Sequence, residues 1–337
     1  MKKIATEEAF VTPEVVAEWD KLLDDGAPAE PGFKLQIGYF HTATDDFTKR
    51  VGERLLELGD MRLQEMDENG IDMQLLSLTA PGVQVFDADT GTALARESND
   101  ILVETVNNNP TRYAGLAAVA PQAPKSAAKE LERAVGLGLK GAIINSHTKG
   151  EYLDAVAYRP ILEAAESLDV PIYIHPNAVA PSMIAPFAER NMAEAFWGFQ
   201  TETALHALRL IVTGTFDRFP NLKIVLGHLG EGIPFWLDRF DRQYGNSRGT
   251  SDRNPTWKAK RLPSDYFDEN FYTTSSGHNW DPAVRFVEDI VGEDRLMFGI
   301  DYPYANCKQQ TDQAATIELK NPSKFYHLNA EKVFKLD

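Results

Sequence analysis

Short runs rich in valine, isoleucine and leucine recur along the chain, and a segment with helical spacing follows each of them. This alternation is typical of parallel strands joined by crossover helices, and strands covered on both faces are nearly all apolar. Eight such runs are present, at residues 2–8, 72–78, 113–120, 139–145, 170–175, 222–228, 271–276 and 295–301. They predict an α/β fold of the (β/α)8 TIM-barrel type.

Two of the intervening segments carry clear helix signals. In residues 126–138 the apolar positions fall on one stripe, as in an amphipathic helix. In residues 279–292, Asp281 is placed to cap a helix and Pro282 suits its first position. Both segments are therefore predicted to be helices that cover the strands.

Three stretches with several glycines or prolines interrupt the alternation: residues 23–46, 177–190 and 244–266. We expect them to be loop insertions over the C-terminal mouth of the barrel. No linker-like change in composition divides the chain, so residues 1–337 are predicted to form a single domain. An open doubly wound sheet is the alternative, and the lack of a glycine-rich turn after the first run argues against it.

Composition and charge exclude several classes of protein. The chain is 43% hydrophobic, and no stretch approaches the ~20 apolar residues needed to cross a bilayer, so a membrane protein is not expected. Lys2 and Lys3 imitate the basic start of a signal peptide, but Glu7 and Glu8 fall where its apolar segment would run, which predicts a cytoplasmic protein. The net charge of −16 repels polyphosphate and argues against a nucleic-acid partner.

Cysteine usage narrows the chemistry further. Cys307 is the only cysteine, so an intrachain disulfide and a cysteine-based zinc site are both excluded. Any metal ion must therefore be bound by histidine, aspartate and glutamate.

Polar residues end several of the predicted strands. The active site of such a barrel gathers at the C-terminal ends of its strands, so these residues should converge on one mouth. Each alone also has an ordinary structural explanation, such as a surface acid, a core histidine, a helix cap or a turn residue. The four that could bind a metal or move protons end the first, fifth, sixth and eighth runs: Glu7, His175, His228 and Asp301.

This set of positions resembles the amidohydrolase superfamily, whose barrels place metal ligands after strands one, five, six and eight. The superfamily's usual pair of first-strand histidines is here Glu7 and Ala9. Because Ala9 cannot ligate, the resemblance implies one ion, bound by Glu7, His175 and Asp301. These oxygen-rich ligands favour Mn²⁺, with Zn²⁺ as the second choice.

Within the superfamily the chain resembles the nonoxidative aromatic acid decarboxylases, which include the γ-resorcylate, 2,3-dihydroxybenzoate and 5-carboxyvanillate enzymes. The motifs that carry this likeness are EEAF (7–10), TAPGVQ (79–84), YIHP (173–176), GHLGEGIPFWLDRFD (227–241), DYPY (301–304) and NAEKVFKLD (329–337). The segment INSHTKGEYLD (144–154) is most similar to the 5-carboxyvanillate branch, which makes that acid the first expected substrate. That branch has a substrate-binding arginine near the long loop 23–46, where Lys49 and Arg50 are the nearby cations here.

The resemblance also implies roles in decarboxylating an ortho-hydroxy aromatic carboxylate. Asp301 would protonate the ring carbon that loses CO₂, and His228, oriented by Glu231, would return protons. Three further residues are expected to contact the substrate: Arg239 at its carboxylate, Tyr304, and Phe10 as an apolar wall. Relatives assemble as dimers or tetramers, so a homo-oligomer is expected.

Two other functions remain open at this point. A metal-dependent hydrolase on the same fold could attack an ester, lactone or amide, although Ala9 removes a ligand that hydrolytic relatives commonly use. A barrel that binds a phenolic acid without converting it is the third possibility, and the full set of acid–base residues argues against it.

Overall fold

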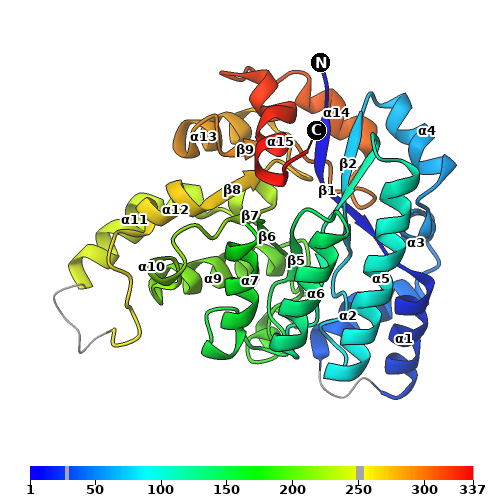
Figure 1. Ribbon diagram of the computed structural model, residues 1–337, viewed down its shortest axis with the longest axis horizontal. Coiled ribbons are helices and arrows are strands. Elements are labelled where there is room, and N and C mark those ends of the chain that lie inside the picture. The colour runs from blue at the N-terminus through cyan, green and yellow to red at the C-terminus, as the bar shows by residue number, and fades with distance from the viewer. Residues whose placement is uncertain (27–29, 248–253, 337) are drawn as a thin grey trace.

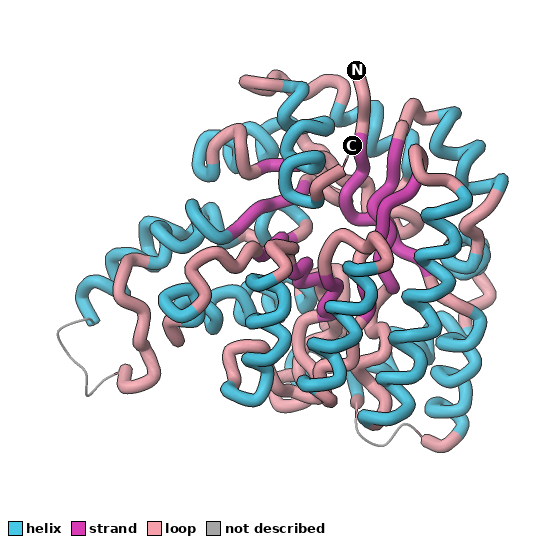
Figure 2. Tube along the Cα trace, viewed as in Figure 1, coloured by secondary structure: helices cyan, strands magenta, loops and turns pink. Residues whose placement is uncertain are grey.

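The computed structural model describes residues 1–26, 30–247 and 254–336. Its strands alternate with helices along the chain, and every paired strand runs parallel to its neighbour. The strands are β1 (Ile4–Phe10), β2 (Met73–Leu78), β3 (Tyr113–Gly115), β4 (Ala117–Ala118), β5 (Ala142–Asn145), β6 (Ile172–His175), β7 (Ile224–Leu226), β8 (Phe271–Thr274) and β9 (Leu296–Met297). Figure 2 shows these strands enclosed by helices.

The strands fall into two sheets, in the orders β1-β2-β3 and β4-β5-β6-β7-β8-β9. Backbone hydrogen bonds join the sheets at both seams. The N–H of Leu116, between β3 and β4, donates to Leu76 O over 2.9 Å. At the other seam the N–H of Thr6 donates to Phe298 O over 3.1 Å, and that of Ala9 to Tyr302 O over 2.7 Å. These bonds close the ring, and the predicted barrel is confirmed.

Helices cover the outside of the ring (Figure 1). On the first half of the chain they are α1 (Pro13–Asp24), α2 (Pro31–Thr42), α3 (Asp46–Leu56), α4 (Asp60–Glu68), α5 (Ala88–Asn108), α6 (Pro124–Gly136) and α7 (Arg159–Ser167). On the second half they are α8 (Ile184–Ala188), α9 (Gly198–Val212), α10 (Thr215–Arg218), α11 (Ile233–Ser247), α12 (Pro263–Asn270), α13 (Asp281–Val291), α14 (Cys307–Ala314) and α15 (Asn329–Phe334). None of the helices that the structure describes is long and apolar enough to cross a membrane.

Several sequence-based boundaries are corrected by the structure. The first strand runs on to Phe10, so Glu7 lies inside it, and the third predicted strand is divided into β3 and β4. The N-cap of α13 is Trp280, one residue before Asp281, which is itself the first helical residue.

The three predicted loops are more ordered than expected. The stretch 23–46 contains α2, because Pro31 at the first turn starts a helix whose buried residues pack inward. Short α8 lies within 177–190, and α11 and α12 extend into 244–266, of which residues 248–253 are outside the described part.

Candidate active site

The polar residues predicted at the barrel mouth do converge. Glu7 comes from β1, His175 from the end of β6, His228 from the short helix η2 (His228–Gly230) after β7, and Asp301 from the segment after β9. One ligand atom from each of Glu7, His175 and Asp301 lies within 4.8 Å of the others. Residues nearly three hundred positions apart thus form one cluster.

The two carboxylate oxygens of Glu7 have different surroundings. Oε2 accepts hydrogen bonds from the hydroxyls of Tyr173 and Ser276, and from Thr274 Oγ1 over 3.1 Å. Oε1 is buried and has no hydrogen-bond partner among the described residues. A Cβ on Gly227 would clash with Oε2, so glycine is required where β7 passes this carboxylate. The site therefore fixes one oxygen and leaves the other free for a ligand.

His175 is oriented by its own backbone. Its Nδ1 lies 2.8 Å from Pro176 O, a carbonyl that can only accept, so Nδ1 carries the proton. The lone pair is then on Nε2, which lies 3.4 Å from Glu7 Oε1. A hydrogen bond of this kind is the usual way to fix the tautomer of a metal-binding histidine.

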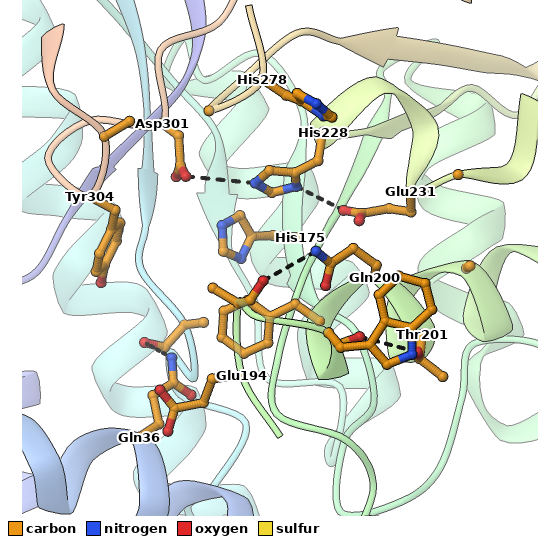
Figure 3. Close-up of a pocket in the computed structure, with 18 of the residues that line it drawn as sticks. Gln36, His175, Glu194, Gln200, Thr201, His228, Glu231, His278, Asp301 and Tyr304 are labelled. Atoms are coloured by element: carbon orange, nitrogen blue, oxygen red, sulfur yellow. Dashed lines mark hydrogen bonds and ion pairs between the residues drawn. The ribbon is translucent and has the colours of Figure 1, made fainter. Parts of the chain in front are cut away.

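A second histidine, His228, lies between two carboxylates, as Figure 3 shows. Its Nδ1 is 2.8 Å from Glu231 Oε1, and its Nε2 is 3.7 Å from Asp301 Oδ2. His228, Glu231 and Asp301 have φ angles of 47°, 55° and 69°, in the left-handed region that non-glycine residues rarely adopt. Such strain persists where the surrounding structure holds the side chains in a required arrangement.

The charges and the burial of this cluster shift the pKa values of its ionisable side chains. Burial disfavours the ionised carboxylate of Glu7, but His228 and His175 outweigh it, and the pKa of Glu7 lies below its ordinary value. Burial also disfavours the imidazolium of His228, yet Glu7 and Glu231 raise its pKa well above the usual range. For Asp301 burial prevails over His228, and the pKa of this carboxyl is raised. The cluster thus favours a protonated His228 and makes the acid form of Asp301 more accessible.

The segment that carries Asp301 is fastened by the neighbouring acid on β1. Glu8 is fully buried, and its carboxylate accepts the N–H of Ile300 over 3.0 Å and that of Tyr302 over 3.2 Å. Because successive strand residues point to opposite faces, Glu7 points into the mouth of the barrel. Glu8 points to the other face of β1, where it binds the backbone on both sides of Asp301.

A cavity of about 830 Å³ opens over this cluster. His175, His228, Asp301 and Tyr304 line it, and aromatic side chains from α2, α9 and α11 form much of its wall. Among the described residues no lysine or arginine lines the cavity. Its volume falls within the range usual for small-molecule sites.

Of the three residues predicted to contact the substrate, one lines the cavity and two do not. Tyr304 lines the cavity, and its hydroxyl lies 2.6 Å from Thr79 Oγ1. Phe10 does not line it: its side chain is 1% exposed and packs in the hydrophobic core. Arg239 is exposed on α11 and is likewise outside the lining, so within this chain it does not meet the cavity.

The two cations near the long loop also lie outside this cavity. Lys49 lines a smaller cavity of about 390 Å³ next to it, and the guanidinium of Arg50 lies 5.4 Å from the ring centre of Phe47. Neither residue contributes to the lining of the main cavity.

Sequence reasoning missed other residues of the site. Tyr173 had a detectable signal, because it is two positions before His175 and therefore faces the same side of β6. Gln36, Glu194 and His278 also line the cavity, but they lie on segments without strand periodicity.

A divalent cation suits this arrangement. Glu7 Oε1 is a buried carboxylate oxygen that accepts no hydrogen bond from the described residues, and Nε2 of His175 and Nε2 of His228 lie 3.4 and 3.6 Å from it. Such an oxygen is costly unless a ligand compensates it. The oriented Nε2 of His175 and a carboxylate oxygen of Asp301 lie within reach of the same point. One nitrogen and two oxygens are a donor set that Mn²⁺ and Zn²⁺ both accept.

Comparisons with known proteins agree on one family. The family described as amidohydrolase matches residues 22–336. The γ-resorcylate decarboxylase of Polaromonas sp. (strain JS666) is 37% identical over 99% of both chains. The 5-carboxyvanillate decarboxylase of Novosphingobium aromaticivorans DSM 12444, solved with manganese and 4-hydroxy-3-methoxy-5-nitrobenzoic acid, matches 99% of this chain and 96% of its own, with a TM-score of 0.97 and 39% identity. A dihydroxybenzoic acid decarboxylase from Polaromonas sp. JS666, solved with manganese and 2-nitroresorcinol, has a TM-score of 0.87 and 36% identity and covers 99% of this chain and 97% of its own.

Proposed function

Since the chain belongs to the amidohydrolase family, we propose that it is a metal-dependent carboxy-lyase that removes CO₂ from an ortho-hydroxy aromatic carboxylate. The observation that carries this proposal is the cluster of Glu7, His175 and Asp301, in which Glu7 Oε1 accepts no hydrogen bond from the described residues. His228, paired with Glu231, lies beside the cluster. The relatives named above are decarboxylases of this substrate class.

The cofactor is proposed to be one divalent metal ion, with Mn²⁺ preferred to Zn²⁺, held by Glu7, His175 and Asp301. Two of the three ligands are carboxylates, which suits the harder ion, and manganese is present in the related structures. When bound, the ion would orient the phenolic and carboxylate oxygens of the substrate and draw negative charge toward them.

Protons are moved by residues of the chain itself. Asp301 in its acid form donates a proton to the ring carbon that carries the carboxylate. The C–C bond then breaks, CO₂ leaves, and the electron pair of that bond restores aromaticity. His228, whose Nε2 lies 3.7 Å from Asp301 Oδ2, then returns a proton to the carboxylate of Asp301. Glu231 holds the imidazole in place at 2.8 Å and stabilises its charged form.

The identity of the substrate is a finer proposal. Likeness to the 5-carboxyvanillate enzyme supports that acid as the first to test, and likeness to γ-resorcylate decarboxylases supports 2,6-dihydroxybenzoate. Tyr304 is proposed to contact the ring, because it lines the cavity beside Asp301.

The hydrolase alternative is not favoured. The curated relatives above 30% identity that cover most of this chain are decarboxylases. A non-catalytic binder is disfavoured by the strained His228–Glu231 pair, which substrate binding alone does not require.

One assay separates these functions. The Mn²⁺-loaded protein is incubated with 5-carboxyvanillate, 2,3-dihydroxybenzoate and 2,6-dihydroxybenzoate, and both CO₂ and the phenol are measured. We expect equal amounts of the two products from at least one acid. Hydrolysis of esters or lactones with no CO₂ from any aromatic acid would overturn the proposal.

Assembly and location are also proposals. A homodimer or homotetramer is expected, and light scattering behind a sizing column would measure it. The cytoplasmic location and the lack of nucleic-acid and membrane partners stay predictions from the composition.

A further inference from the structure

The cavity is larger than the reacting end of the substrate requires. Asp301, His228 and Glu231 lie together at one end of it (Figure 3), and a single aromatic ring bound there would fill only part of its 830 Å³. Cavities of this size usually hold ligands larger than one ring. The side chains around the remaining space should therefore determine which group a substrate carries there.

One wall of the remaining space is an apolar stripe on α11. Ile233, Trp236 and Phe240 line the cavity, and spacings of three and four residues place them on one face of the helix. We call these three residues the α11 stripe. It begins two positions after Glu231, the partner of His228, and at a rise of about 1.5 Å per residue it is about 10 Å long. The stripe thus leads away from the acid–base pair.

A second wall is a row of aromatic rings. Tyr304, Phe40 and Tyr39 line the cavity, and we call them the aromatic row. The ring centres of Tyr304 and Phe40 are 6.3 Å apart and those of Phe40 and Tyr39 are 6.1 Å apart, both in edge-to-face contact. Figure 3 draws Tyr304 and Glu231 on opposite sides of Asp301 and His228, so the row and the stripe begin on opposite sides of the reacting groups.

Both walls leave apolar surface uncovered. Trp236 is 47% exposed and Tyr39 is 53% exposed, although both line a concave site. Phe40 and Phe240, farther inside, are half-buried. Apolar surface in such a site gains free energy when an apolar ligand removes it from water, and uncovered apolar patches of this kind often mark binding sites.

Polar side chains line the cavity too, but two of them are already engaged by the backbone. Gln200 Nε2 donates to Ala195 O over 3.1 Å, and Thr201 Oγ1 donates to Trp197 O over 3.1 Å. Aromatic and aliphatic side chains still supply much of the lining, and two continuous sets of them lead outward from the reacting end. This arrangement suits an apolar group attached to the ring.

Building on the proposed decarboxylation, we infer that the substrate is an ortho-hydroxyaryl carboxylate with an alkyl or aryl group on the ring edge away from the reacting carboxylate. This group lies between the α11 stripe and the aromatic row. Each methylene that it removes from water improves binding by about fourfold when burial is complete.

A matched pair of acids tests the inference. 5-Methylsalicylate and 5-butylsalicylate share the reacting carboxylate and the ortho-hydroxyl, and their alkyl groups affect the electrons of the ring almost equally, so the pair differs in apolar length. Their kcat and KM are measured with the Mn²⁺ holoenzyme. The corresponding products, 4-methylphenol and 4-butylphenol, have no carboxylate to lose, so calorimetry gives their Kd without turnover.

The variants Trp236→Ala and Phe40→Ala each remove a ring from one wall. Trp280→Ala is the matched control, because Trp280 is also an exposed tryptophan, at 59%, and does not line the cavity. Circular dichroism shows whether each variant is folded.

We expect kcat/KM for the butyl acid to exceed that for the methyl acid by at least about tenfold, since three methylenes are partly buried. The gain should appear in KM, because the walls contact the alkyl group equally before and during the reaction. The Kd values of the two phenols should differ by a similar factor. Each wall variant should reduce both ratios at least about threefold, whereas Trp280→Ala should leave them within about twofold.

The outcomes separate this inference from the proposed function. If neither salicylate, nor 2,6-dihydroxybenzoate or 5-carboxyvanillate, releases CO₂, the proposed function fails, and the two phenols still report on the walls. Ratios within about twofold of one in the wild type would overturn the inference. So would a large ratio that both folded wall variants retain, because the alkyl group would then lie elsewhere. If a second copy of the chain covers the walls instead, the butyl group brings no gain and Trp236→Ala changes the oligomeric state on a sizing column, which also overturns the inference.

Discussion

Replacing Tyr173 by phenylalanine removes one of the three hydroxyl donors that hold Glu7 Oε2 and keeps the ring that packs in β6. Ser276 and Thr274 keep their bonds, so Glu7 should stay ionised but become less firmly oriented. A hydrogen bond to a charged acceptor contributes about 1.5–3 kcal/mol, and outer partners of metal ligands typically change affinity about 10–100-fold. We therefore expect the Mn²⁺ Kd to rise by one to two orders of magnitude.

The assay is a Mn²⁺ titration of the apoprotein, followed by calorimetry or by the spin resonance of the free ion. Tyr272→Phe is the matched control, because Tyr272 is a buried tyrosine of the barrel strand β8 whose hydroxyl bonds no described residue. Saturating Mn²⁺ should restore kcat in Tyr173→Phe to within about threefold, since the ligands themselves are intact. An unchanged Kd in folded Tyr173→Phe, or an equal loss in Tyr272→Phe, would refute the role given to this hydroxyl.

Three further changes test other parts of the structure. Asp301→Asn should lower kcat by more than ~10²-fold, because the amide supplies no acidic proton, and metal analysis of the variant shows whether the ion is still bound. Gly227→Ala should displace the Glu7 carboxylate and weaken Mn²⁺ binding at least about tenfold, whereas Gly136→Ala, whose new Cβ meets no atom within 4 Å, should not. Burial and nearby cationic groups lower the pKa of His206 from 6.5 to about 3. As the pH falls below 6.5, this histidine therefore binds a proton in the unfolded chain while it is still neutral in the folded protein. The free energy of unfolding should be unaffected by this histidine above pH 6.5 and should be lower by about 2 kcal/mol at pH 5. His206→Gln should remove this pH dependence between pH 6.5 and about 5, as measured by urea unfolding.

Strand positions explain why the convergence of the polar residues at the barrel mouth could be predicted from sequence. His175 ends β6, and His228 and Asp301 directly follow β7 and β9, so a parallel barrel must bring them to one mouth. Glu7 was placed at a strand end and lies within β1, yet it still faces the cluster. Alternation along a strand determines the face of a side chain, and the face matters more than the distance from the strand end.

The same alternation shows why Phe10 fails as a substrate wall. It is two positions from Glu8, so the two share a face of β1, and both side chains are buried away from the cavity. On α11 the cavity-lining residues Ile233, Trp236 and Phe240 recur at helical spacing, and Arg239 lies beside that stripe. Parity along β1 and helical phase along α11 were readable in the sequence, and they place Phe10 on the face of Glu8 and Arg239 beside the cavity-lining stripe.

Gln36 lines the cavity as well, but no periodic signal points to it. Gln36 lies in a stretch expected to be a loop, and that stretch contains α2, which starts at Pro31 and packs closely against the loop after β6. Gly32 shows how close this packing is: a Cβ there would lie 2.6 Å from Ala178 Cβ, in the loop after β6. The position of Gln36 therefore depends on a tertiary contact between segments about 140 residues apart in the chain. In this fold the residues of the cluster follow from strand order, whereas cavity-lining residues such as Gln36 follow from packing of the inserted segments.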